Sequence, residues 1–313
     1  MLTASVTVPL GATGSERHPA QDFPPITVLL SWSPDKVAGH VWLHHGFARS
    51  PAHLDSLTAR LVDSGFVVAR PHVSSFRRPR TLNDGPYLAG VIRGYDTAVA
   101  GGVITDVVRH DVEASGFVMM GHSAGGAVVV HQAATLHGST QTALTTTALT
   151  TTALTPTAST STASTSTERA TLTVSGIVLL DANESLSKLM EPALAELDET
   201  PVLLCSARPH RCNRQAMVSR MLLERRRGFV GALFPTGGHC DAEGRADLTC
   251  KAMCGGGTPD PADVAALWTL STAWAADCAQ HTIDPEWRPG GAGYDELLGS
   301  GRIQTLESLH STS

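Results

Sequence analysis

A serine at position 123 lies between glycines in the stretch GHSAGG, residues 121–126. Gly121, Ser123 and Gly125 satisfy the pattern Gly-x-Ser-x-Gly, and they stand between an apolar run and a segment with a helical pattern. Where a strand passes into a helix, this pattern holds a nucleophilic serine on a sharp turn, and the glycines prevent clashes with neighbouring backbone. The alternative is a turn of small residues without chemistry.

A serine hydroxyl is a weak nucleophile near neutral pH and needs a base to take its proton. In the chain order serine, acid, histidine, the base follows the last strand of a sheet. His239 comes directly after the apolar run 228–236, in the stretch GGHCD, so we predict that it is the base. The histidines that compete with it are His44, His45, His122 and His210.

The acid must accept the imidazole N–H and stabilise the imidazolium. The stretch CSARPHRCNRQ, at the end of the apolar run 200–207, contains no acidic residue. The preceding run, 175–183, carries Asp181 close to its end. We therefore predict Asp181 as the acid. Glu184, three residues further on, and Asp241, only two residues from the predicted base, are the alternatives.

Backbone N–H groups are expected to hold the negative oxygen of a tetrahedral intermediate. The first is the N–H of Ala124, and the second is that of Phe47, which follows a turn at Gly46 in the stretch HHGF. We expect substrate to contact Phe47, His122 and Leu186. The last of these lies in a short helical segment, SLSKLMEPALAEL, that can line an open groove, and ordinary packing of this segment is the alternative.

These residues need a scaffold that brings the ends of several strands together. Eight short apolar or β-branched runs are expected to be strands, at residues 5–10, 26–32, 40–46, 66–72, 117–121, 175–183, 200–207 and 228–236. The first two are expected to pair antiparallel, because no helical pattern separates them. From residue 40 onward strands alternate with helical patterns, which favours a parallel, doubly wound sheet. Two helices have clear start signals, Ser50 with Pro51 and Asp260 with Pro261.

Residues 1–281 are expected to form a single domain. Within it, residues 142–166 repeat a pentapeptide five times and contain no charged or aromatic residue. Such a segment cannot build an apolar core, so we expect residues 137–170 to be a disordered, Thr-rich insertion. Residues 282–313 are expected to form a loosely ordered tail.

Composition limits the class of partner. The chain has 313 residues, of which 42% are hydrophobic, and a formal net charge of −6, so no electrostatic feature favours nucleic acid or an acidic membrane surface. The longest apolar runs are too short to cross a bilayer, so no integral membrane segment is expected. The N-terminal stretch has no signal-peptide pattern, which favours a cytoplasmic protein, although clustered cysteines keep secretion as an alternative.

Three of the six cysteines, Cys240, Cys250 and Cys254, lie close together near His239. A zinc site is one interpretation, but Cys-x3-Cys is not the spacing of a typical zinc finger. A disulfide near the site is the favoured one, and six cysteines allow 15 pairings between which the sequence does not choose. An arginine-rich stretch between residues 208 and 227 is expected to be a solvated helix face, with contact to carboxylates or to an anionic surface as the alternative.

The stretches HHGF, GHSAGG, LLDAN and GGHCD together resemble the α/β-hydrolase superfamily of serine esterases, over residues 25–280. The segment around HHGF and the stretch GHSAGG look most like the chlorophyllase and bacterial cutinase-like polyester hydrolase branches. The resemblance implies an α/β-hydrolase fold, with a mostly parallel eight-stranded sheet, helices on both faces and no large cap domain. Chlorophyllase-like members place the acid after the strand that follows the nucleophile helix, which agrees with Asp181.

From these features we expect a serine carboxylester hydrolase that acts through Ser123, His239, Asp181 and an acyl-enzyme intermediate. Hydrophobic or bulky esters, small or polymeric, are the expected substrates, as for esterases, lipases and polyester hydrolases. No metal or organic cofactor is expected. The alternatives are an acyltransferase, an amide or thioester hydrolase on the same residues, or a catalytically silent binding domain.

Overall fold

The computed structural model describes residues 1–8, 26–35, 37–73, 91–92, 95, 116–151, 173–184, 190–225, 229–255 and 257–310, with side chains between 116 and 151 described up to residue 138. Its elements in chain order are β1 (Leu2–Val8), β2 (Ile26–Trp32), β3 (Gly39–His44), η2 (Pro51–Leu54), α1 (Asp55–Asp63), β4 (Phe66–Pro71), β5 (Phe117–His122), α4 (Ala124–Thr151), β6 (Val174–Leu180), α5 (Met190–Glu196), β7 (Val202–Ala207), α6 (Met217–Arg225), β8 (Val230–Phe234), η5 (Asp241–Glu243), α7 (Leu248–Cys254), α8 (Pro261–Gln280), η6 (Pro285–Trp287), α9 (Ala292–Gly299) and η7 (Leu306–His310). All eight predicted strands are present.

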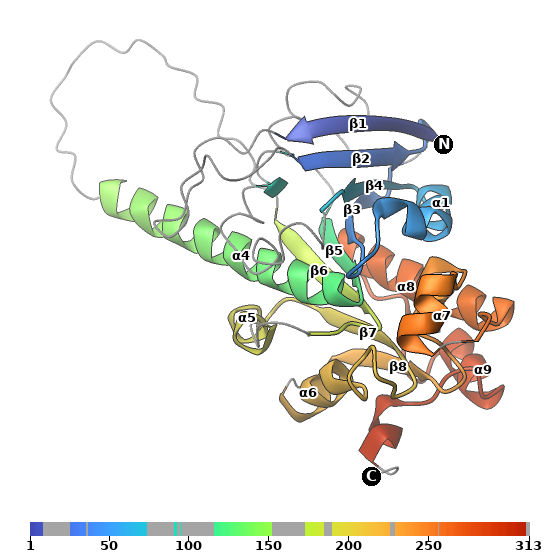
Figure 1. Ribbon diagram of the computed structural model, residues 1–313. Coiled ribbons are helices and arrows are strands. Elements are labelled where there is room, and N and C mark those ends of the chain that lie inside the picture. The colour runs from blue at the N-terminus through green and yellow to red at the C-terminus, as the bar shows by residue number, and fades with distance from the viewer. Residues whose placement is uncertain are drawn as a thin grey trace, which may run out of the picture.

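The eight strands form one sheet in the order β1-β2-β4-β3-β5-β6-β7-β8 (Figure 1). β1 pairs antiparallel with β2, as predicted, and β2 pairs antiparallel with β4. The strands β3 to β8 are mutually parallel in their pairs. Because parallel strands end at the same edge of a sheet, the loops after β3, β5, β6, β7 and β8 can meet around one site.

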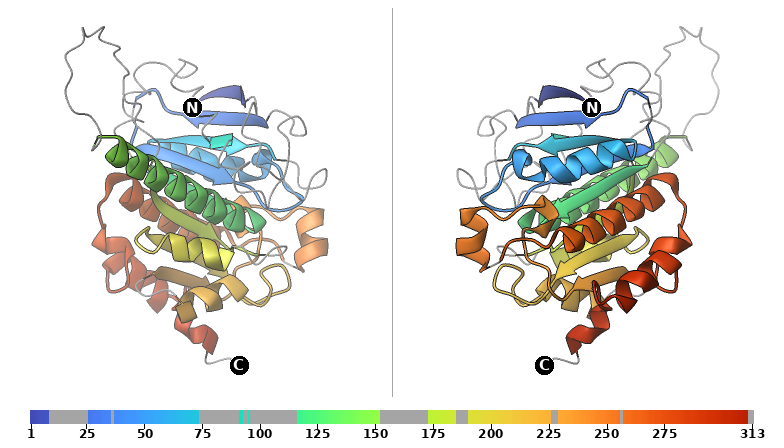
Figure 2. Two further views of the ribbon diagram at one scale, coloured as in Figure 1. Left: turned by 90° about the vertical axis from the view of Figure 1, so that its left-hand side faces the viewer. Right: turned by 90° about the vertical axis from the view of Figure 1, so that its right-hand side faces the viewer.

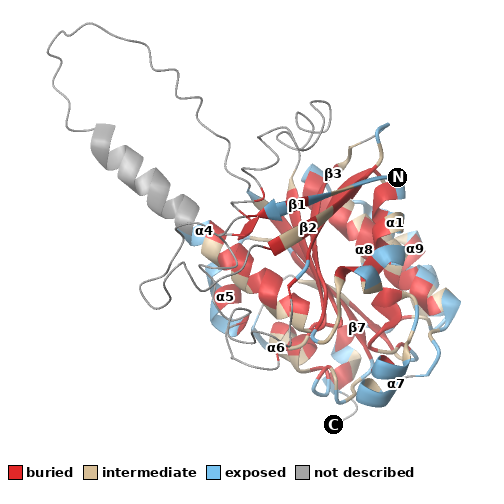
Figure 3. Cartoon of the chain, turned by 45° about the horizontal axis from the view of Figure 1, so that its top comes forward, coloured by how far each residue is buried: buried red, intermediate tan, exposed pale blue. Residues whose placement is uncertain are grey.

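Helices cover both faces of the sheet, with α4, α5 and α6 on one face and α1 and α8 on the other (Figure 2). The strand β6 shows why both faces are needed, since its residues alternate between two apolar cores. Ile177 and Leu179 belong to the core that includes α4, whereas Val178 and Leu180 belong to the core that includes α8. Buried residues therefore run through the strands from both sides (Figure 3), which confirms the predicted fold class.

Two predicted helix starts are confirmed. Ser50 has extended backbone and precedes η2, in which Pro51 occupies the first turn, and α1 follows directly. At the start of α8, the Asp260 carboxylate accepts a hydrogen bond from the Ala262 N–H at 2.8 Å. The Asp260 cap thus satisfies an N–H group that has no partner inside the helix.

The C-terminal segment differs from the prediction of a loosely ordered tail. It contains η6, α9 and η7, and the side chains of Tyr294, Leu306 and Leu309 are buried. The Tyr294 hydroxyl donates to the Gly231 carbonyl of β8 at 2.9 Å. A Cβ at Gly231 would lie only 2.1 Å from a methyl carbon of Leu306, so this glycine makes room for the tail. The tail is therefore packed against the edge strand of the sheet.

The Thr-rich insertion predicted at residues 137–170 begins within α4, which continues to Thr151. The rest of this prediction, residues 152–170, lies outside the described residues. No helix in the described part of the chain combines the length and the apolar character that spanning a bilayer requires.

Candidate active site

Ser123 occupies the turn between β5 and α4 with a φ of 57°, in the left-handed region that L-residues seldom adopt. Its N–H donates to the Leu180 carbonyl at 3.0 Å, which ties the turn to the neighbouring strand. A Cβ at Gly121 would lie 2.4 Å from the carbonyl oxygen of Gly125, and a Cβ at Gly125 would lie 2.5 Å from that of His44. The glycine spacing is therefore required by close backbone packing, and the strained turn presents the serine side chain.

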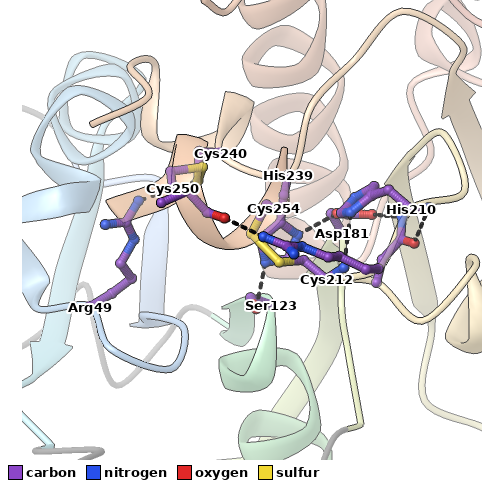
Figure 4. The surroundings of a disulfide bond; sticks show 12 residues. Arg49, Ser123, Asp181, His210, Cys212, His239, Cys240, Cys250 and Cys254 are labelled. Carbon is purple, nitrogen blue, oxygen red and sulfur yellow. Dashed lines mark hydrogen bonds and ion pairs between the residues drawn. A yellow bond between two sulfur atoms is a disulfide. The ribbon is translucent and has the colours of Figure 1, made fainter. Parts of the chain in front are cut away.

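His239, on the loop after β8, reaches this serine. Its Nε2 atom lies 2.8 Å from Ser123 Oγ, and its Nδ1 atom lies 2.5 Å from Asp181 Oδ2 (Figure 4). All three side chains are buried. The structure thus brings together the three residues that the sequence suggested, from the ends of β5, β6 and β8.

Asp181 follows β6 and receives four hydrogen bonds. Its Oδ1 atom accepts from the Ala207 N–H at 3.0 Å and from Asn213 Nδ2 at 2.9 Å. Its Oδ2 atom accepts from His239 Nδ1 and from His210 Nε2, the latter at 3.1 Å. Burial alone would raise the pKa of Asp181, but the hydrogen bonds from His210 and His239 hold this pKa well below its usual range. The carboxylate is therefore ionised throughout the neutral range.

His210, for which the sequence suggested only a competing role as base, contacts Asp181. The Cys212 N–H donates to its Nδ1 atom at 3.1 Å, so the neutral ring carries its proton on Nε2 and donates it to Asp181. The loop after β7, which has no acid, thus supplies donors to the acid of the preceding strand. The sequence feature that indicates this role is the absence of Asp and Glu from the loop. Its polar side chains are then available as donors to a carboxylate on a neighbouring strand.

The alternative acids are not placed on the imidazole. Glu184 accepts a hydrogen bond from the Met190 N–H at 2.7 Å, at the start of α5. Asp241 accepts one from the Gly238 N–H at 2.8 Å. Neither carboxylate is hydrogen-bonded to His239, which leaves Asp181 as the partner of this ring in the described structure.

Three other histidines are buried around the turn. Burial lowers the pKa of His44 to about 4 and that of His45 to about 3, and both rings bond to backbone carbonyls through Nδ1. Burial also lowers the pKa of His122 to about 3, so this ring is neutral. His122 donates from Nε2 to the carbonyl of His239 at 2.7 Å, and it therefore holds the backbone of the loop that carries His239.

A cavity of about 250 Å³ opens beside Ser123. Its lining includes Phe47, Ala124 and His122, which the sequence suggested as oxyanion or substrate contacts, and Phe47 is 37% exposed. Leu186 lies outside the described residues. Met190 and Leu194, from the same helical segment, are buried in the core beneath α4 and are absent from the cavity lining. The alternative of ordinary packing is therefore correct for these two residues.

Gly46 brings the loop after β3 against the serine. A Cβ at this position would lie 2.8 Å from the Cβ of Ser123 and 3.3 Å from its Oγ atom. The next residue, Phe47, lines the same cavity as Ala124, the first residue of α4. Residues of two separate segments therefore border the space in front of the serine.

Two disulfides surround this cavity, Cys212–Cys254 and Cys240–Cys250, with Cα–Cα distances of 5.3 and 6.6 Å. Cys205 and Cys278 are buried free thiols. All three sulfur atoms considered for zinc, those of Cys240, Cys250 and Cys254, are thus engaged in disulfides. A second group with suitable ligand atoms, Asp181, His210 and His239, lies within 4.8 Å, but its members are hydrogen-bonded to each other.

Arg49 connects the walls of the cavity. Its guanidinium pairs with Glu243 at 2.8 Å and with Asp247 at 2.7 Å, and it contacts the Cys240 sulfur at 3.3 Å. In the arginine-rich stretch, Arg211 and Arg214 line the cavity mouth and are exposed. This part of the stretch borders the site, which the prediction of a plain solvated helix face did not include.

The structure is similar to two solved hydrolase structures at low sequence identity. A dienelactone hydrolase from Anabaena variabilis ATCC 29413 has a TM-score of 0.54 and 15% identity, over 90% of this chain and 99% of that one. The esterase domain of a Rhodothermus marinus protein has a TM-score of 0.50 and 11% identity, over 88% of this chain and 98% of that one. No protein-family model and no curated protein matches the sequence. The fold is that of the α/β-hydrolases.

Proposed function

We propose that the chain is a serine carboxylester hydrolase. The observation that carries this proposal is the continuous chain of hydrogen bonds from Ser123 Oγ through His239 to Asp181, beside an open cavity. A left-handed turn that orients a buried serine toward a histidine is costly, and such strain is typical of catalytic sites. The structural similarity to a dienelactone hydrolase and to an esterase domain supports the same class of reaction.

In the proposed reaction Ser123 Oγ attacks the ester carbonyl while His239 Nε2 takes the hydroxyl proton. The tetrahedral intermediate collapses, and His239 returns that proton to the departing alcohol. Water then attacks the acyl-enzyme, again giving a proton to His239, and the acid is released as the serine recovers its hydrogen. Asp181 stays ionised throughout, orients the ring and stabilises the imidazolium.

The N–H groups of Phe47 and Ala124 are the proposed donors to the oxyanion. Such preorganised donors are worth about 2.7–4 kcal/mol each in related chemistry. His122 and His210 act through other residues, the first by holding the backbone of His239 and the second by donating to Asp181. Both are positioning residues in this proposal.

The proposed substrates are esters with an apolar group of moderate size. Phe47 and Met253 line the cavity and expose 37% and 43% of their surface, which offers apolar contact to an acyl or aromatic group. The position of Asp181 after β6 supports the chlorophyllase-like branch as the nearer relative. The two disulfides support secretion or another oxidising compartment, the alternative that the cysteine cluster suggested.

Labelling with a fluorophosphonate tests the proposal directly. We expect stoichiometric modification of Ser123 in the folded protein, located by peptide mass spectrometry, and none in S123A or in heat-denatured protein. Hydrolysis of p-nitrophenyl acetate should be lost in S123A. An unlabelled Ser123 in folded protein would show that this fold serves binding instead of hydrolysis.

A further inference from the structure

The helix α7 (Leu248–Cys254) forms part of the cavity wall beside Ser123. Its residues Thr249, Cys250, Met253 and Cys254 contribute to the lining. In Figure 2 this helix stands apart from the helices that cover the two faces of the sheet. It is therefore an addition to the sheet and its covering helices, placed where it can contact a bound substrate.

Each disulfide joins α7 to a loop that carries a histidine of the site (Figure 4). Cys250 is bonded to Cys240, the neighbour of His239 in the chain. Cys254 is bonded to Cys212, two residues from His210. Both covalent links thus run from the wall of the cavity to the residues around Asp181.

Noncovalent contacts hold the two ends of the helix. Asp247 caps its start, accepting from the Cys250 N–H at 2.7 Å, and also pairs with Arg49 at 2.7 Å. Near its end, the Arg211 guanidinium donates to the carbonyl of Ala252. These contacts fix the position of the helix relative to the loops after β3 and β7.

Apolar packing contributes little to this placement. Cys250 is the one fully buried residue of the seven, and Leu248 and Met253 are 86% and 43% exposed. The residue after the helix, its C-cap Gly255, has a φ of 70°, and the sequence continues with two more glycines before α8. Since glycine allows many backbone conformations, a helix with so small a buried face depends on its cross-links for a fixed position.

We propose that α7 is a covalently tethered wall that limits the size of the ester group accepted beside Ser123, with Met253 setting the limit. This inference rests on the proposed function. Met253 is the long apolar side chain that α7 contributes to the cavity lining. Shortening it enlarges the space next to the serine, whereas the turn that holds the nucleophile is unchanged.

A pair of single variants tests the size limit. The measured quantity is the ratio of kcat/KM for p-nitrophenyl benzoate to kcat/KM for p-nitrophenyl acetate. M253A is expected to raise this ratio about tenfold, as removal of apolar groups from a substrate pocket typically does. L248A, on the same helix but absent from the cavity lining, should leave the ratio within about twofold of wild type. An unchanged ratio in M253A overturns the proposal.

The tether is tested in the double variants C212A/C254A and C240A/C250A. Amide hydrogen exchange of residues 248–254 should accelerate at least about tenfold in each, while exchange in β5 and β6 stays slow. Exchange as slow as in wild type would show that the disulfides do not hold the helix. If Ser123 is labelled by fluorophosphonate but the ratio of kcat/KM values is unchanged in M253A, the size limit is overturned and the hydrolase proposal stands. If Ser123 is not labelled, the hydrolase proposal fails and the size limit with it.

Discussion

His210 lies edge-on to His239, with ring centroids 5.3 Å apart and an interplanar angle of 68°. The two rings donate to the same oxygen of Asp181, one from Nε2 and the other from Nδ1. A carboxylate that receives a second donor beside the imidazole of His239 is held in one orientation. The loop after β7 therefore takes part in positioning His239 through Asp181, although the stretch CSARPHRCNRQ contains no acidic residue.

Replacing His210 should slow turnover without weakening substrate binding. H210F removes one hydrogen bond to a charged group, worth about 1.5–3 kcal/mol, so kcat should fall at least about tenfold. H210Q keeps an amide donor near the position of Nε2 and should recover most of the loss. Steady-state kinetics with p-nitrophenyl acetate would measure both constants, with KM expected to change little. Equal activity in the two variants would contradict a positioning role.

Replacing the acid should be far more damaging than replacing its nearest alternative. D181N presents an amide where His239 needs an ionised acceptor, and kcat should fall on the order of 10³–10⁴-fold. E184Q is the matched control, because Glu184 bonds to the Met190 N–H and not to the imidazole. We expect E184Q to retain near wild-type kcat. A larger loss in E184Q than in D181N would move the acid to position 184.

The contact between Gly46 and Ser123 should not tolerate a methyl group. In G46A the new Cβ would lie 2.8 Å from the serine Cβ, so the loop or the nucleophile must shift. Misplacement of about 1 Å costs roughly 10²-fold in rate, and we expect a loss of this size in kcat/KM. G257A, where no atom lies within 4 Å, is the control and should behave as wild type. Full activity in G46A would show that the loop adapts.

Stability should depend on pH through Asp241. Burial raises the pKa of this carboxyl from its ordinary value of 3.8 to about 6 in the folded protein. Between these values the folded state binds more protons than the unfolded state, so the free energy of unfolding falls as pH rises. The difference between a pKa of 3.8 and one of about 6 corresponds to roughly 3 kcal/mol in the free energy of unfolding.

The variant D241N removes this titration and isolates its contribution. Urea unfolding of the wild type and of the variant, each at acidic and at neutral pH, measures their free energies of unfolding. Relative to D241N, wild type should lose about 2–3 kcal/mol of stability between roughly pH 4 and pH 7. Parallel pH dependences in the two proteins would show that Asp241 titrates at its ordinary pKa.

The sequence was sufficient for the sheet and for the residues that end its strands. Apolar runs and helix start signals such as Ser50–Pro51 depend on local pattern, and the parallel order then brings Ser123, Asp181 and His239 to one edge. Their proximity is a consequence of topology, and topology follows from a few general rules. The catalytic roles of these residues remain our proposal.

The position of His210 depends on a backbone conformation that the sequence pattern does not predict. Arg214, Gln215 and Ala216 have φ values of 50°, 61° and 57°, three left-handed residues in succession and none of them glycine. Asn213 supports this turn by accepting from the His210 and Ala216 N–H groups. Local propensity favours other conformations for such residues, so the turn results from tertiary contacts.

Long-range packing explains the ordered C-terminal tail, which differs from the prediction, and the disulfide pairing, which the sequence left open. The C-terminal tail is ordered because Leu306 fills the space left by Gly231, a match between residues 75 positions apart that no periodic pattern reveals. The disulfide pairing likewise follows from where α7 lies. Cys254 meets Cys212 across 42 residues, although Cys250 is much nearer to it in sequence.

The ion pairs of Arg49 have a consequence for the order in which the molecule is completed. Their partners, Glu243 and Asp247, are 194 and 198 residues further along the chain. Contacts between residues so far apart in sequence form late in folding, because closing a long loop lowers the entropy of the chain before the contact stabilises it. During synthesis, the turn at Ser123 can form long before His239 and the helix α7 have been added to the chain. The proposed activity is thus expected to be absent during synthesis and to arise only when the last third of the chain has docked.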